Sequence, residues 1–148
     1  MSIRVVSRLI AVLLSVSPPV PPVNGTVVDG FRAPACQRCV GHRGVTIATT
    51  AQSSVRAATA GIIVFVGQVA HVLYVVEDIG QGAKITYGRL GGATVTFGQV
   101  VVAGEVIGVS GPELYLGVRV GGRYVDPLRF LGFGRGHLVG PGSVIVGR

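Results

Sequence analysis

Residues Gln99 to Pro127, QVVVAGEVIGVSGPELYLGVRVGGRYVDP, decide the fold class of this chain. The stretch consists of short apolar runs rich in valine, and each run ends at a glycine, a Gly-Gly pair or an Asp-Pro pair. β-Branched residues favour strands, whereas glycine and proline favour the turns between strands. The stretch therefore predicts several short β-strands in succession, with the domain closing around Leu131.

The same pattern extends back to Thr26, and no sustained helical period follows residue 23. A long apolar run, IIVFVGQVAHVLYVV at residues 62–76, is interrupted by Gly67, and we expect the chain to bend or turn near that residue. These patterns predict an all-β domain over residues 26–132, built as a small antiparallel β-sandwich or barrel-like domain of short glycine-bounded strands.

The N-terminal region has the features of an export signal. Arg4 and Arg8 precede LIAVLLSV at residues 9–16, an apolar run too short to cross a bilayer as a mature helix. Residues 1–17 are therefore predicted to be a secretory signal peptide, with an uncleaved N-terminal anchor that engages the membrane as the alternative. The proline cluster that follows predicts a stiff, extended linker over residues 18–25, outside the fold.

The C-terminal residues 133–148 are rich in glycine and predict a loosely ordered tail. His137 lies in this segment without neighbours of metal-binding type, so it is interpreted as a tail residue rather than a ligand. His71, in VAHVLYVV, also lacks a partner at metal-ligand spacing. A position in a turn or on a strand surface is favoured for His71 over one near a functional cleft.

The charge of the chain limits its partners. Thirteen basic residues stand against six acidic ones, for a net charge of +7. Such an excess fits a polyanion: nucleic acid, an anionic membrane or a cell-wall polymer. The arginines are scattered, without a basic run or basic and aromatic alternation, which argues against direct nucleic-acid recognition. Lys84 lies within the strand-like AKITY and not at a hairpin tip, which argues against a biotinyl or lipoyl carrier domain.

The segment GHRGVTIA, residues 41–48, contains the first candidate ligand. In a strand, His42 and residue 46 point to the same face, and a carboxylate at residue 46 would complete part of a metal site. Residue 46 is Thr46. Just upstream, Cys36 and Cys39 form a C-x-x-C pair. A small disulfide loop is favoured for them, with free thiols or a closed metal site with His42, and possibly Glu113, as the alternatives.

The order of several segments resembles the LytM/lysostaphin-type peptidoglycan endopeptidases, metallopeptidase family 23, across residues 26–131. The segments that show the resemblance are TVVDGFRAP, GHRGVTIA, VRAATAGIIVFVG, ITYGRL, VVVAGEVIGVSG and ELYLGVRVGGRYVDPLRFL. The resemblance implies a β-sheet core of the duplicated hybrid motif type. It also implies a zinc site, held by the histidine and aspartate of an H-x-x-x-D segment and by the second histidine of an H-x-H strand, with a position open for water.

This sequence departs from that motif at most of its positions. His42 matches the first zinc ligand, whereas Thr46 occupies the place of the aspartate. The H-x-H strand corresponds to ELY, so that Glu113 stands in place of the assisting histidine and Tyr115 in place of the last ligand. Arg89 occupies a place where many members have a further histidine near the site.

A neutral threonine and a phenol with a pKa near 10 are poor substitutes for a carboxylate and an imidazole. The resemblance then implies a catalytically degenerate domain with no catalytic residues and no cofactor. Its expected role is a binding or regulatory module for peptidoglycan, an anionic cell-wall polymer or an envelope protein, secreted or held in the cell envelope. The alternative is an active zinc endopeptidase that cleaves peptidoglycan cross-links through a rearranged metal site.

Overall fold

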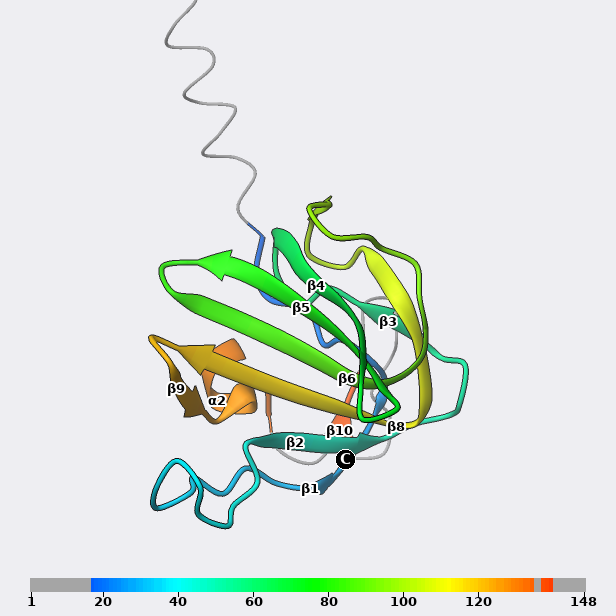
Figure 1. Cartoon of the computed structure of the whole chain (residues 1–148). Helices are drawn as coiled ribbons and strands as arrows, with labels where there is room; N and C mark the ends of the chain where they lie inside the picture. Colours follow the sequence, from blue (N-terminus) through cyan, green and yellow to red (C-terminus); the bar gives the residue numbers. More distant parts are fainter. Residues whose placement is uncertain (1–16, 135–136, 140–148) are drawn as a thin grey trace, which may run out of the picture.

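The structure is a computed structural model that describes residues 17–134 and 137–139, and it consists mainly of antiparallel strands (Figure 1). The strands are β1 (Gly25–Asp29), β2 (Gly44–Ala48), β3 (Ser54–Arg56), β4 (Gly61–Val69), β5 (Val72–Gly80), β6 (Ala83–Ala93), β7 (Val100–Val101), β8 (Val106–Val120), β9 (Arg123–Val125) and β10 (His137–Leu138). A short helix, α2 (Pro127–Leu131), follows β9. The predicted all-β class is confirmed.

The strands form one sheet in the order β10-β1-β2-β8-β6-β5-β4-β7, and β3 and β9 pair with β8 outside this path. The sheet does not close on itself. Strand β8, fifteen residues long, pairs with β2, β3, β6 and β9 along its length. Figure 1 shows β5, β6 and β8 running side by side across the molecule. The stretch that predicted the fold class thus supplies the strand that pairs with four others.

The register divides the long strands into two faces. Val45, Leu116, Tyr87 and Val75 are successive partners across β2, β8, β6 and β5, and each is at most 1% exposed. Their strand neighbours point to the opposite side because side chains alternate along a strand. We call that opposite side the open face. It includes the polar and glycine positions of the same strands, and the candidate site lies on it.

The proline-rich segment is part of the fold, contrary to the linker predicted over residues 18–25. The Val20 amide donates to the Ala58 carbonyl at 2.8 Å, and the Arg56 amide donates to the Pro22 carbonyl at 2.8 Å. Val23 is 3% exposed and belongs to the hydrophobic core. An extended proline-rich backbone has no internal hydrogen bonds, so its free amides and carbonyls can bond to a neighbouring segment.

The C-terminal residues also differ from the predicted tail. Asp126 caps α2 by accepting a hydrogen bond from the Leu128 amide at 3.1 Å, and Gly132 ends the helix with a φ of 78°. His137 and Leu138 then pair with β1, and Leu138 is 2% exposed. The loosely ordered tail was the wrong expectation for these two residues, since an apolar side chain is buried at the sheet edge. The rest of that prediction, at residues 135–136 and 140–148, lies outside the described residues.

The turn predicted near Gly67 lies three residues further along the chain. Gly67 lies inside β4, and β4 and β5 are joined at Ala70 and His71, whose φ angles are 50° and 66°. His71 is therefore an exposed turn residue, as the favoured interpretation expected. The predicted signal segment covers residues 1–17, of which residues 1–16 lie outside the described part of the chain. Among the residues it does describe, no helix is long and apolar enough to span a membrane.

Candidate functional site

His42 uses both ring nitrogens in contacts within the protein. Its Nδ1 lies 2.9 Å from the Gly30 carbonyl oxygen. A carbonyl only accepts, so Nδ1 donates, and Nε2 of the neutral ring is left as an acceptor. Nε2 lies 3.3 Å from Thr46 Oγ1, whose hydroxyl can donate to it. The nitrogen that would bind a metal is thus directed at the side chain that replaces the expected carboxylate.

Tyr115 completes the predicted cluster. Thr46 and Tyr115 are direct partners in the β2–β8 register, and Thr46 is 4% exposed. The rings of His42 and Tyr115 meet edge to face, with centroids 6.0 Å apart and an interplanar angle of 72°. The structure therefore brings together the three positions that the resemblance assigned to zinc ligands.

The chemistry of these three side chains does not fit zinc. Burial, together with the neighbouring Tyr124 and Tyr74, raises the pKa of Tyr115 to about 12. The phenol is therefore neutral at physiological pH, and so is the Thr46 hydroxyl. One imidazole with two neutral hydroxyls is not a zinc-binding set, because zinc is bound by imidazole, thiolate and carboxylate groups. Within residues 17–134 and 137–139, no cluster of three or more His, Cys, Asp or Glu side chains could hold a metal ion.

Asp29 is a site residue that sequence reasoning missed. It pairs with Thr46 beyond a bulge in the β1–β2 register, and its Oδ2 lies 3.6 Å from His42 Nδ1. A hydrogen bond from Arg32 lowers the pKa of this carboxyl group. The signal in the sequence was an acidic residue directly after an apolar run, in TVVDGF, but its distance of 13 residues from His42 concealed the contact. Asp29 faces Nδ1, the nitrogen already bonded to Gly30, and so it does not supply the missing ligand on the Nε2 side.

Arg89 and Glu113, at two further positions of the family's site, form an ion pair. Arg89 donates to Glu113 Oε1 at 2.7 Å, and both side chains are about half exposed. Arg89 has a left-handed backbone, with a φ of 59°. An exposed pair of this kind adds little to stability. Its consequence is chemical, since the Glu113 carboxylate accepts a charged hydrogen bond and is not a free general base.

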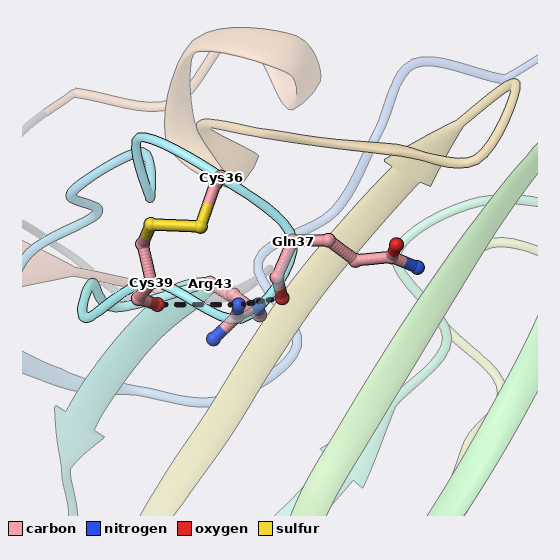
Figure 2. The surroundings of a disulfide bond; sticks show 4 residues. All are labelled: Cys36, Gln37, Cys39 and Arg43. Carbon is pink, nitrogen blue, oxygen red and sulfur yellow. Dashed lines mark hydrogen bonds between the residues drawn. A yellow bond between two sulfur atoms is a disulfide. The ribbon is translucent and has the colours of Figure 1, made fainter.

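Cys36 and Cys39 are joined by a disulfide, which was the favoured of the three interpretations (Figure 2). The loop is tied to the start of β2 by Arg43, which donates to the Gln37 carbonyl at 2.7 Å and to the Cys39 carbonyl at 3.4 Å. With both sulfurs bonded to each other, neither is a thiolate available for a metal site with His42.

Removing the disulfide is expected to have a small effect on stability. The double variant Cys36→Ser/Cys39→Ser should lose about 2 kcal/mol of unfolding free energy or less, because closing so short a loop restricts the unfolded chain only slightly. Urea unfolding of the oxidised protein and the variant measures this. A loss above about 4 kcal/mol would show that the loop supports the sheet and is not merely attached to it.

The chain is similar to known peptidases in sequence and in fold. The model of peptidase family M23 matches residues 40–127, more than half of the chain. A zinc-containing peptidase from Vibrio cholerae is 27% identical, with a TM-score of 0.61, over 73% of this chain and 37% of that one. A putative peptidase M23 from Pseudomonas aeruginosa is 25% identical, with a TM-score of 0.59, over 89% of this chain and 61% of that one. No curated protein matches.

The catalytic domain of lysostaphin from Staphylococcus simulans has the same fold, with a TM-score of 0.57 at 23% identity over 70% of this chain and 89% of that one. The open antiparallel sheet, with His42 packed against Tyr115 of β8, defines a domain of the LytM type. The chain belongs to peptidase family M23. It spans less than two thirds of the length of the first two solved relatives.

Proposed function

We propose that this chain is a non-hydrolytic member of peptidase family M23 that binds the cell wall or regulates an enzyme acting on it. The observation that supports this most directly is the set of side chains at the family's ligand positions. His42 keeps its place, but Thr46 fills the carboxylate position with a neutral hydroxyl bonded to the imidazole. Tyr115 adds a second neutral hydroxyl, since burial holds the pKa of its phenol at about 12.

The proposed partner is peptidoglycan or an anionic polymer attached to it. The net charge of +7 favours a polyanion, and the family match supports a wall substrate rather than nucleic acid. The proposed location, secreted or in the cell envelope, follows from the N-terminal sequence and from that match. The disulfide between Cys36 and Cys39 is of the kind that persists in an oxidising compartment outside the cytoplasm. An envelope protein is the alternative partner.

The alternative function is an active endopeptidase with a rearranged zinc site. The observation in its favour is Asp29, a carboxylate that lies 3.6 Å from the imidazole of His42. A metal at His42 Nε2 would have to displace the contact with Thr46 and recruit ligands that now lie elsewhere.

Metal content, hydrolysis and retention, measured on the full chain, separate these functions. Purified protein is analysed for zinc, incubated with sacculi to detect released fragments, and pelleted with sacculi at moderate salt against a basic control protein of equal charge. We expect retention above that control, without zinc and without release of fragments. Stoichiometric zinc that is lost in His42→Ala, together with hydrolysis, would establish the endopeptidase instead. Retention no better than the control would refute wall binding.

A further inference from the structure

Two tyrosine rings lie over glycines on the open face. A Cβ added at either glycine would collide with a tyrosine ring. A Cβ at Gly44 would lie 2.7 Å from the Tyr115 ring. A Cβ at Gly88 would lie 2.6 Å from the Tyr74 ring and 3.2 Å from the Tyr115 ring. Tyr74, Gly88 and Tyr115 are successive register partners on β5, β6 and β8. The two half-buried rings thus flank one bare glycine, and we call them the tyrosine platform.

A hollow of about 350 Å³ opens beside the platform on the same face. Its lining includes Val76, Thr86, Lys84 and Arg119. Val76 and Thr86 come two residues after Tyr74 and two before Gly88 on their strands, so they form the next row on the open face. Lys84 and Arg119 form the row beyond it. The platform and this last row are therefore separated by about 14 Å, the length of a short oligosaccharide.

The cations at the far end of the hollow are placed to bind an anion. Lys84 and Arg119 are exposed and directly opposite each other in the β6–β8 register. Like charges in directly opposed positions destabilise a strand pair. Among the described residues neither side chain forms a salt bridge, and Arg119 lies 5.5 Å from the centre of the Tyr124 ring. Asp78, opposite Lys84 on β5, is the acidic residue of the hollow.

The backbone beneath these side chains is not available to a ligand. Strands β5, β6 and β8 are each paired on both sides along this region. A peptide cannot add to them as a further strand, because their amides and carbonyls are used in the sheet. Recognition must come from side chains: flat aromatic surfaces, a threonine hydroxyl and two cations. Tyrosine rings pack on the apolar face of a sugar ring, and cations bind its carboxylates.

We propose that the open face binds a glycan strand bearing carboxylates, with sugar rings on the tyrosine platform and a carboxylate between Lys84 and Arg119. This rests on the proposed wall-binding function and specifies its ligand. In the wall, such a ligand is a glycan strand whose stem peptides have been removed, since each muramic acid residue then has a free lactyl carboxylate. The position that would be a zinc ligand in a hydrolase, Tyr115, becomes part of the surface that contacts the sugar.

The test measures binding of the full chain to four probes. These are whole sacculi, glycan strands stripped by an amidase, the same strands with carboxylates converted to amides, and free stem peptides. We expect the stripped strands to bind at least tenfold more tightly than the amidated strands. The variant Lys84→Gln/Arg119→Gln should weaken binding to stripped strands about tenfold. The variant Tyr74→Leu/Tyr115→Leu, which keeps apolar bulk over Gly88, should weaken it by a similar factor.

The matched control is Arg123→Gln/Arg129→Gln, which removes the same charge from β9 and α2. It should change binding less than threefold. An equal loss in this control would show that net charge alone attracts the strands, and would overturn the proposal. Binding to sacculi without binding to stripped strands, or competition by stem peptides alone, would also overturn it while leaving wall binding intact. No retention on sacculi would overturn the proposed function as well.

Discussion

The double variant Thr46→Asp/Tyr115→His is expected to bind one zinc ion per chain. His42 Nε2 already points at position 46, and positions 46 and 115 are direct partners across β2 and β8. The substitutions would place two imidazoles and one carboxylate around one point, which is the donor set of a zinc site with a position open for water. We expect zinc affinity to rise at least a thousandfold, or about 4 kcal/mol, measured by equilibrium dialysis and metal analysis.

The unfolding temperature provides an independent measurement. Position 46 is 4% exposed, so a carboxylate there without metal is a buried charge and should lower the stability of the metal-free variant. Zinc at a hundred times its dissociation constant should then restore about 2.7 kcal/mol. Adding His42→Ala to the double variant should abolish the effect of zinc. Stoichiometric zinc binding by the unsubstituted chain would contradict the expectation that the substitutions create the site, because other residues would then already supply a complete ligand set.

The second large effect concerns a carboxyl group inside the core. Glu77 is fully buried on β5, between Ile63 and Ile85 in the register. Its Oε1 accepts a hydrogen bond from the Tyr87 hydroxyl at 2.8 Å, and that hydroxyl accepts one from the Ala58 amide at 2.8 Å. In the described part of the chain, Oε2 has no hydrogen-bond partner. Burial raises the pKa of Glu77 to about 7, although the bond from Tyr87 opposes the rise.

We therefore expect the protein to lose stability as the pH rises from about 4.5 to 7. The folded state holds the Glu77 proton more tightly than the unfolded state, whose carboxyl titrates near 4.5. The stabilising effect of that proton is complete below the unfolded pKa and is lost as the pH passes the folded pKa. The difference between the two pKa values corresponds to roughly 3 kcal/mol. Chemical unfolding at half-unit pH intervals measures the loss.

The variant Glu77→Gln isolates this contribution. The amide stays neutral, so the unfolding free energy of the variant should not show the decline with rising pH that is assigned to Glu77. At pH 5 the variant should be less stable than the parent by about 1–2 kcal/mol, since a buried amide donor then lacks a partner. The two curves should converge and cross as the pH rises. Asp78→Asn, on the open face of the same strand, is the matched control. Parallel curves for the parent and Glu77→Gln would refute the buried proton.

Local sequence patterns predicted the fold class because its strands are bounded by glycine. Gly121 and Gly122 have positive φ angles and form the turn between β8 and β9, as their position in the pattern suggested. The turn between β4 and β5 was expected near Gly67, and its exact position was missed because Ala70 and His71 adopt left-handed angles without being glycine. The role of the proline segment was missed for another reason. Its hydrogen bonds to Arg56 and Ala58 depend on tertiary contact, which cannot be predicted from the local composition of the segment.

The candidate site could be predicted only in part. The period of two along a strand placed His42 and Thr46 on one face, and the family order added Tyr115, so the cluster itself was predictable. Asp29 was not, because it reaches His42 through a bulge in the β1–β2 register. The tyrosine platform depends on which residues are partners across three strands. That information lies in the register, and a single sequence does not specify it.

The proline segment has a mechanical consequence. Backbone hydrogen bonds at Val20 and Pro22 join it to Ala58 and Arg56, and Val23 is inserted into the core. Tension applied upstream of residue 20 would load these bonds and the buried valine before it reached β1. The segment is therefore a rigid attachment and not a flexible linker. The orientation of the open face is fixed relative to residue 20. Shortening the chain to begin at Asn24 would remove this attachment together with Val23 of the core.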